Sequence, residues 1–334
     1  MNIIIPMAGM GKRMRPHTLT IPKPLIPIAG KPIVQRLVED IAKVCPEKID
    51  EIGFIIGDFG AEVEEKLLKT AEKVGAKGRI FYQTEALGTA HAIQCASDLL
   101  TGPVIVAFAD TLFSANFKMD TSPDGMIWVQ KVEDPSAFGV VLVNEQNVIT
   151  DLVEKPQTFV SDLAIIGIYY VKDGQWLKAE IDHLITNDLK EKGEYQLTNA
   201  LENMKKKGAQ FVTGAVDEWL DCGNKDATVY TNQRILELVK KTENLVSQKA
   251  VLENSVVIEP CYIGPDVILR NAVVGPHVSI GHGTVIENCV VSNTIIQEKS
   301  HLSRVVVANS MVGNFSQFHG QALDLSVGDY VAIR

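Results

Sequence analysis

Cysteine is scarce in this chain of 334 residues and follows no pairing pattern. The five cysteines are odd in number and widely scattered, at Cys45, Cys95, Cys222, Cys261 and Cys289. This distribution excludes a disulfide framework, which needs paired cysteines, and a zinc cluster, which needs closely spaced ligands. We therefore expect a reduced, cytoplasmic protein.

Long hydrophobic runs are also missing. The N-terminus has no basic segment ahead of its apolar stretch, which breaks at Pro6, and no apolar run is long enough to cross a bilayer. We expect no membrane partner. The hydrophobic content of 46% and the charged content of 22% are those of an ordinary globular protein, long enough for two domains or for one large domain with an appendage.

Dense runs of positive charge are absent as well. Acidic residues outnumber Lys and Arg by 41 to 32, which gives a net charge of −9 and argues against a general nucleic-acid binder. The lysine triplet Lys205–Lys207 is typical of the solvated end of a helix. Positive charge gathers instead between Lys12 and Lys31, which favours a small anionic ligand.

Two common phosphate-binding signatures are missing near the N-terminus. The apolar strand Ile3–Ile5 leads into the bend Gly9–Lys12, but no Ser or Thr follows Lys12 as in a Walker A loop. Met14 stands where a Rossmann fingerprint has its third glycine. The bend still combines glycines, which let backbone N–H groups approach a phosphate, with the nearby cations Arg13, Arg15 and Lys23. It indicates a polyphosphate ligand; the alternative is a strand-to-helix turn with ordinary surface cations.

Strand-like and helix-like segments alternate from the start of the chain to about residue 235. Such alternation predicts a mainly parallel sheet covered by helices on both faces, with ligands at the carboxyl ends of the strands. The bend after Ile5 and the carboxylate of Asp110 both fall at such ends. The expected elements are strands at 52–56, 80–83, 103–109 and 148–153, with helices at 61–74 and 89–100.

After an expected helix at 228–246, apolar residues recur at every sixth position. Registers of this kind are Val251, Val257, Ile263 and Leu269; Ile268, Val274, Ile280 and Ile286; Val290, Ile296 and Leu302; Val306, Val312 and Phe318. A six-residue period punctuated by Gly and Pro is typical of a β-helix built from hexapeptides, whereas a small β-sandwich would show a period of two. We expect about four coils of three hexapeptides each.

The N-terminal motifs resemble the signature of the sugar-1-phosphate nucleotidyltransferases. The matching segments are Gly9-Met10-Gly11-Lys12-Arg13, Arg15-Pro16-His17-Thr18 and Pro22-Lys23-Pro24. The resemblance implies a Rossmann-like catalytic domain at 1–235, a helical linker at 236–250, a left-handed β-helix at 251–320 and a C-terminal tail at 321–334. It also implies transfer of a nucleotidyl group from a nucleoside triphosphate to a sugar-1-phosphate, with Arg13 and Lys23 as catalytic cations.

The same resemblance implies a magnesium site made by two distant carboxylates. Asp110 follows an apolar strand, and Asp221 lies in Trp219-Leu220-Asp221-Cys222-Gly223, which matches the family's Trp-x-Asp-x-Gly motif. Taken alone, Asp110 would pass as a helix N-cap and Asp221 as a turn residue. In the family these two positions bind the catalytic metal.

Further motifs imply where the two substrates bind. Leu87-Gly88-Thr89-Ala90 resembles the segment that approaches the nucleoside, and a glutamine at the position of Gln83 reads a pyrimidine edge in uridylyl- and thymidylyltransferases. The implied nucleotide-binding residues are Ala8, Gly9, Gly11, Gln83, Leu87, Gly88 and Thr89. The motif Glu154-Lys155-Pro156, preceded by Gly139, implies that Gly139, Glu154 and Lys155 bind the sugar phosphate.

The sequence departs from the family at Ile165, where many relatives have an asparagine that binds a sugar hydroxyl. The sugar therefore stays open, with glucose-1-phosphate and UTP or dTTP as the expected pair. A guanylyltransferase acting on mannose-1-phosphate is an alternative, as is a non-catalytic nucleotide-sugar sensor. Acetyl transfer by the β-helix is a third, with His277, His282, His301 and His319 as candidate bases. The β-helix also predicts a homo-oligomer.

Overall fold

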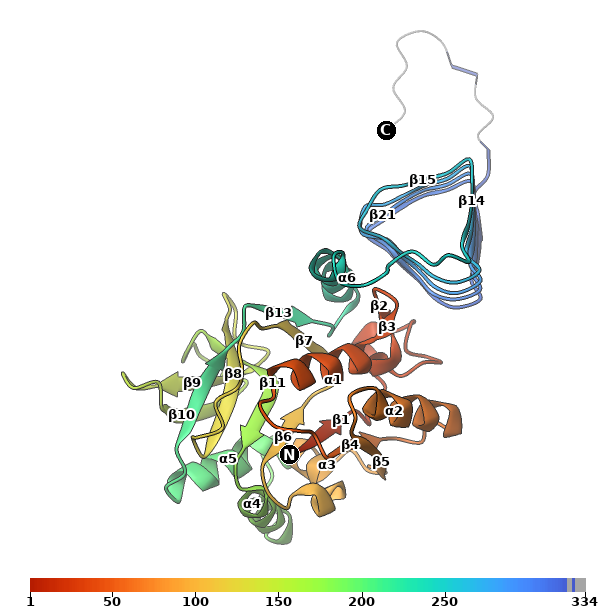
Figure 1. Ribbon diagram of the computed structural model, residues 1–334. Coiled ribbons are helices and arrows are strands. Elements are labelled where there is room, and N and C mark those ends of the chain that lie inside the picture. Colours follow the sequence, from red (N-terminus) through yellow and green to blue (C-terminus); the bar gives the residue numbers. More distant parts are fainter. Residues whose placement is uncertain (323–325, 328–334) are drawn as a thin grey trace. The chain divides into compact units, whose positions relative to one another are not determined.

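The computed structural model describes residues 1–322 and 326–327, so most of the tail expected at 321–334 lies outside the described residues. The chain forms two compact units (Figure 1). The first consists of Met1–Ile26 and Lys31–Asn224, and the second of Pro27–Gly30 and the chain from Lys225 onward. The boundary predicted at 235 falls inside helix α6, Lys225–Val239.

The first unit is built on a nine-stranded sheet whose central strands are parallel. β1 (Asn2–Pro6) pairs in parallel with β4 (Glu51–Ile56) and with β6 (Val104–Ala107), and β5 (Lys77–Tyr82) extends the sheet beyond β4. Ile3, Ile4 and Ile5 are all fully buried, as expected for a strand covered on both faces. The predicted α/β fold is confirmed.

Antiparallel strands continue the sheet on the other side of β6. The full path is β10-β9-β11-β6-β1-β4-β5, and β8 pairs with both β11 and β12. The bounds of the added strands are β8 Gly125–Lys131, β9 Gly139–Val143, β10 Ile149–Glu154, β11 Leu163–Val171 and β12 Phe211–Ala215. A separate pair, β7 (Thr111–Ser114) and β13 (Glu218–Asp221), is antiparallel.

Helices cover both faces of this sheet (Figure 1). α1 (Ile33–Val44) and α2 (Ala61–Lys73) lie on one face, and α3 (Thr89–Cys95), α4 (Gly174–Thr186) and α5 (Leu197–Lys206) lie on the other. α1 is amphipathic: its buried apolar residues recur at helical spacing, namely Ile33, Val34, Leu37, Val38, Ile41 and Val44. No helix among the described residues is long and apolar enough to cross a membrane.

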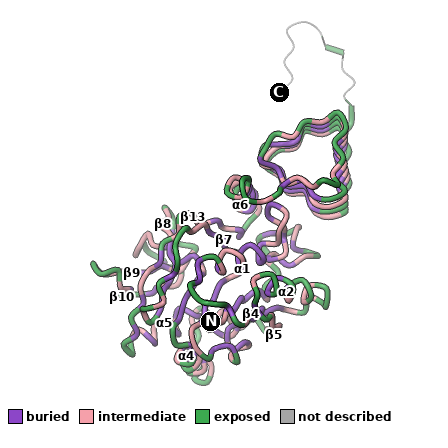
Figure 2. Tube along the Cα trace, in the orientation of Figure 1, coloured by how far each residue is buried: buried purple, intermediate pink, exposed green. Residues whose placement is uncertain are grey.

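The second unit contains the predicted left-handed β-helix, whose short strands stack into three parallel sheets. The first sheet is β14-β17-β20-β23-β26, the second β15-β18-β21-β24 and the third β16-β19-β22-β25. The strand bounds, from β14 to β26 in order, are Val251–Glu253, Val256–Val257, Tyr262–Ile263, Ile268–Arg270, Val273–Val274, Ser279–Ile280, Val285–Glu287, Val290–Ser292, Ile295–Ile296, His301–Ser303, Val306–Ala308, Met311–Val312 and Gln317–His319. Buried residues line the inside of the coils (Figure 2).

The expected coil of three hexapeptides is too long. Stacked asparagines are 17 residues apart in the early coils and 16 in the last ones. Corners are shortened by residues in the left-handed conformation, such as Asn271 and Asn288 with φ of 47° and 53°. The strict six-residue register is therefore wrong for Val290 and Val306, which face outward at 46% and 81% exposure while the residues that follow them turn toward the core.

Candidate active site

The bend after β1 positions a lysine through close backbone packing. Gly11 has φ 72°, and the short 3₁₀ turn Lys12–Met14 follows it. The Thr18 hydroxyl donates to the Gly11 carbonyl over 2.8 Å, which fixes the bend. A Cβ on Gly11 would lie 2.8 Å from the Cβ of Lys23, so only glycine leaves room for that side chain.

Lys23 forms an ion pair with the first predicted metal carboxylate. Its Nζ lies 2.7 Å from Oδ2 of Asp110, and the exposed fractions of the two side chains are 12% and 35%. The 3₁₀ turn Lys23–Leu25 holds the lysine at one end. Asp110 is the third residue after β6, so it lies at the carboxyl end of a buried strand, as predicted. Such a half-buried pair has no net charge, but an arriving anion or cation can separate it and bind the ammonium or the carboxylate.

Strand pairing brings Asp221 to Asp110. Asp221 is the last residue of β13 and pairs with Thr111, the first residue of β7. The next backbone N–H, of Cys222, donates to the Asp110 carbonyl over 2.9 Å. The two carboxylates are more than a hundred positions apart in sequence, and the β7–β13 pairing places them side by side. The sequence motifs could assign these two residues, but they could not show this pairing.

The electrostatics of Asp221 fit a cation site. Burial and the nearby charge of Asp110 raise the pKa of Asp221, while the Gly223 N–H bond and the charges of Lys23 and Arg13 act against that rise. Two carboxylates that repel each other supply the oxygen ligands that Mg²⁺ prefers. The described residues contain no group of three or more His, Cys, Asp or Glu arranged to hold a metal. An ion here would therefore need further ligands from outside this pair.

We expect Asp221→Asn to raise the melting temperature of the metal-free protein by a few degrees at pH 7. A carboxylate whose pKa is raised in the folded state favours folding while protonated and loses that contribution as pH rises through its folded pKa. The gain over the parent should therefore shrink as the pH is lowered from 7 toward 4 and Asp221 takes up its proton. Thermal melts across this range measure it, with exposed Asp217→Asn as the control. A lower melting temperature at every pH would contradict the assignment.

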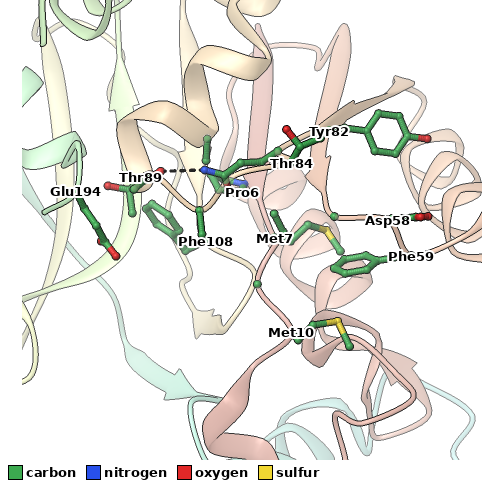
Figure 3. A pocket seen from close by; sticks show the side chains of 17 residues that line it. Pro6, Met7, Met10, Asp58, Phe59, Tyr82, Thr84, Thr89, Phe108 and Glu194 are labelled. Atoms are coloured by element: carbon green, nitrogen blue, oxygen red, sulfur yellow. Dashed lines mark hydrogen bonds between the residues drawn. The ribbon is translucent and has the colours of Figure 1, made fainter. Parts of the chain in front are cut away.

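A cavity of about 830 Å³ opens between the bend and α3 (Figure 3). Figure 3 shows Met7, Met10 and Phe59 on one side of it and Thr89 and Phe108 on the other. Of the predicted nucleotide residues, those that line the cavity are Ala8, Gly9, Gln83, Gly88 and Thr89; Gly11 and Leu87 are not among its lining residues. Leu87 packs against the hydrophobic core instead.

Gln83 already uses its amide nitrogen within the chain. Nε2 lies 3.2 Å from the Gly88 carbonyl oxygen, to which it donates, and 3.1 Å from Nδ1 of His91. Nε2 donates one hydrogen to Gly88, and it donates the second to His91 in the tautomer that leaves Nδ1 unprotonated. The oxygen Oε1 remains as an acceptor. Gly88 itself has φ 115°, and a Cβ there would lie 2.5 Å from the Tyr195 carbonyl oxygen, so this turn requires glycine.

A second cavity of about 420 Å³ adjoins the first, because Thr89 and Phe108 line both. It brings together residues predicted for catalysis, metal binding and sugar-phosphate binding, namely Arg13, Asp110, Gly139, Glu154, Lys155 and Asp221. Ile165 also lines it and is 6% exposed, so this part of the wall is apolar. A Cβ on Gly139 would lie 3.1 Å from Glu154 Oε2 and 3.2 Å from Ile165 Cδ1, so a larger residue would crowd the cavity.

The backbone at Lys155 is held by a residue that the motifs did not indicate. Lys155 has φ 45°, an unusual conformation for a non-glycine residue, and its Nζ lies 3.6 Å from Glu154 Oε1. The Lys192 ammonium donates to the carbonyl oxygens of Glu154 and Lys155 over 3.1 and 3.2 Å. Nothing in the local sequence of Lys192 could have revealed this contact, because it depends on two loops meeting in space.

Gly11→Ala should cost both stability and activity. The added methyl group clashes with Lys23 and moves the ammonium away from Asp110, and misplacing a charged group in a site costs about 10- to 100-fold in rate. Gly75→Ala is a matched control, because Gly75 has φ 75° but no atom within 4 Å of an added Cβ. Both variants should lose about 1 kcal/mol of unfolding free energy from the left-handed backbone, and Gly11→Ala should lose more because of its clash. Equal activities in the two variants would contradict the role given to Gly11.

Comparison with known proteins shows which chains this one is similar to. A family model described as nucleotidyl transferase matches residues 2–237. The low-salt glycan biosynthesis nucleotidyltransferase Agl11 of Haloferax volcanii is 31% identical over 71% of this chain and 66% of its own. The bifunctional protein GlmU of Methanococcus aeolicus is 29% identical over 78% of this chain and 60% of its own. This chain thus spans two thirds or less of the length of these relatives.

Other relatives match over more of their length. The glucose-1-phosphate thymidylyltransferase of Streptomyces antibioticus is 26% identical over 94% of this chain and 92% of its own. Among solved structures, a UDP-glucose pyrophosphorylase complexed with UDP-glucose superposes with a TM-score of 0.59 at 23% identity, covering 71% of this chain and 98% of that one. A similarity at this level supports the fold.

Proposed function

Because this chain belongs to the nucleotidyl transferase family, we propose that it joins a nucleoside triphosphate to a hexose-1-phosphate and releases pyrophosphate. The observation that carries the proposal is the pair of adjoining cavities. They have room for two substrates, and the wall formed by Thr89 and Phe108 is common to both. Arg13, Lys155 and the two aspartates line the smaller cavity, whereas Lys23 lines neither cavity and is placed beside the smaller one by its ion pair with Asp110.

The reaction is a displacement at phosphorus. A phosphate oxygen of the sugar-1-phosphate attacks the α-phosphorus of the triphosphate, a new P–O bond forms, and the bond to the β-phosphate oxygen breaks as pyrophosphate leaves. Arg13 and Lys23 hold the triphosphate and the leaving group, and Lys155 holds the sugar phosphate, so the protein mainly positions two anions and neutralises their charge. Asp110 and Asp221 would bind Mg²⁺, which when bound supplies positive charge beside the phosphate oxygens.

The place of Gln83 in the lining of the larger cavity supports UTP or dTTP, through the resemblance to uridylyl- and thymidylyltransferases. Its acceptor Oε1 suits the ring N–H that uracil and thymine have at N3. Guanine also carries a ring N–H, so a guanylyltransferase stays the second candidate. Ile165 offers no hydrogen bond to a sugar hydroxyl, so it does not select the sugar, and glucose-1-phosphate is the working choice from the family resemblance.

Pyrophosphate release in the presence of Mg²⁺ tests the proposal. Five nucleoside triphosphates are crossed with the 1-phosphates of glucose, mannose, galactose and N-acetylglucosamine. We expect turnover with UTP or dTTP and glucose-1-phosphate, and little with ATP or CTP. Silence across the grid, with nucleotide-sugar binding still detected by calorimetry, would favour a non-catalytic sensor. Acetyl-CoA consumption would favour an acetyltransferase site in the β-helix.

A further inference from the structure

A histidine outside both cavities contacts the glutamine that lines the larger one. His91, the third residue of α3, is half-buried and is not among the lining residues of either cavity, whereas Gln83 lines the larger one. Nδ1 of His91 lies 3.1 Å from Nε2 of Gln83. The sequence motifs assigned no role to His91, so this contact needs an explanation of its own.

The backbone of Gln83 and the carbonyl group beside its side chain are both held in place. The Gln83 N–H donates to the Ile56 carbonyl over 2.9 Å, which continues the pairing of β5 with β4. The Gly88 carbonyl accepts from the Ala92 N–H over 3.1 Å at the start of α3, and from Gln83 Nε2 over 3.2 Å. A carbonyl oxygen can only accept a hydrogen bond, so the end of the amide that faces Gly88 is the nitrogen.

His91 accepts the second hydrogen of the same nitrogen. It can do so in the tautomer that carries the ring hydrogen on Nε2 and leaves Nδ1 with its lone pair. The reversed amide would turn Oε1 toward the Gly88 carbonyl oxygen, where two acceptors repel each other. Gly88 and His91 together therefore hold the amide of Gln83 in one orientation.

We propose that His91 is a positioning residue for nucleotide selection, which acts by fixing the orientation of the Gln83 amide. The inference rests on the proposed function, in which Gln83 meets the base. An amide held in this way offers an acceptor to N3 of a pyrimidine, where uracil has a hydrogen and cytosine has a lone pair. An amide that is free to turn offers its nitrogen to cytosine as well. His91 thereby favours UTP over CTP.

The matched pair His91→Leu and His91→Asn tests the inference. Leu and Asn have the same heavy-atom skeleton, but only Asn carries an acceptor oxygen on Cγ, where histidine carries Nδ1. The affinities for UTP and CTP in the presence of Mg²⁺ are measured by calorimetry, alongside pyrophosphate release. We expect His91→Leu to lower the preference for UTP over CTP about fivefold, the effect of one lost hydrogen bond. His91→Asn should keep the parent preference.

A double-mutant cycle shows whether His91 acts through Gln83. In the Gln83→Ala background there is no amide to orient, so adding His91→Leu should leave the ratio of UTP to CTP affinity unchanged. Gln94→Leu is the control on the same helix, because it removes the 3.1 Å contact between Gln94 Nε2 and Asp182 and lines neither cavity. It should keep the parent ratio, and melting curves show that every variant folds.

The outcomes separate this inference from the proposed function. If the parent binds UTP in preference to CTP without turnover, and His91→Leu loses that preference, the positioning role stands and the proposed reaction fails. An unchanged ratio in His91→Leu, or an equal fall in His91→Leu and His91→Asn, would overturn the inference even in a parent that turns over. A parent that prefers CTP, binds both nucleotides equally or binds neither would overturn it as well.

Discussion

Asp110→Asn is expected to slow nucleotidyl transfer by about 10³-fold while leaving the fold intact. The amide keeps the size of the side chain but removes its charge, so the Lys23 ammonium loses the carboxylate oxygen that lies 2.7 Å away. The substitution also leaves Asp221 as the single carboxylate for a divalent cation. Both losses fall on charge at the reacting phosphates, so kcat should fall much more than nucleotide affinity.

The control for Asp110 is an aspartate in an ordinary ion pair. Asp98 is 70% exposed and lies 3.1 Å from the Arg79 guanidinium, outside both cavities. Asp98→Asn should keep full activity, because an exposed pair of this kind contributes little. Initial rates of pyrophosphate release over a range of Mg²⁺ concentrations give the comparison. Activity of Asp110→Asn within tenfold of the parent would refute the metal-binding and charge-positioning role of Asp110.

The first unit follows its sequence closely where local pattern and burial agree. The strand predicted at 52–56 is found at Glu51–Ile56, and the helix predicted at 61–74 at Ala61–Lys73. The strand has a continuous apolar run, and the helix has its buried residues at helical spacing, so each pattern matches one type of secondary structure. The helix predicted at 89–100 stops at Cys95, and a 3₁₀ turn follows at Ser97–Leu99. The tighter turn lets the adjacent Leu99 and Leu100 both reach the core, where each is 1% exposed.

The second unit departs from its sequence where tertiary pairing competes with helix formation. The helix predicted at 228–246 ends at Val239. Beyond it, Leu245 and Val246 are extended, because the Ile263 N–H donates to the Leu245 carbonyl and Val246 forms a parallel bridge with Ile263. Helical propensity alone could not reveal that these two residues begin the β-helix. The six-residue register likewise missed that corners built on left-handed asparagines shorten the coil.

The sequence motifs predicted which residues form the candidate site, but they did not predict the contacts that position those residues. The order of the motifs assigned Asp110, Asp221, Glu154 and Lys155, and the second cavity contains all four. The contacts that position them come from loops and strands distant in the chain, such as Lys192 against the Glu154–Lys155 turn. Contacts of this kind form between segments far apart in the chain, so the spacing of residues within one motif cannot predict them.

Lys155→Gln should raise the KM for the sugar-1-phosphate by about 30-fold, since a charge-assisted contact to phosphate is worth roughly 2 kcal/mol. The Lys155 side chain is 55% exposed at the edge of the smaller cavity, with Glu154 as its ion-pair partner at 3.6 Å. An incoming phosphate would compete for this ammonium. The KM for the nucleoside triphosphate should change less than twofold, because Lys155 is absent from the lining of the larger cavity.

The contrast between the two KM values separates this role from a structural one. Lys66→Gln provides the control, since Lys66 is 59% exposed on α2 and pairs with Glu62 at 2.7 Å. It should leave both KM values unchanged. The substitution does not change the hydrogen bonds from Lys192 to the carbonyl oxygens of residues 154 and 155. The unfolding free energy of Lys155→Gln should therefore stay within about 0.5 kcal/mol of the parent value. A parallel rise in both KM values would instead indicate that Lys155 shapes the whole site, and its assignment to the sugar phosphate would be wrong.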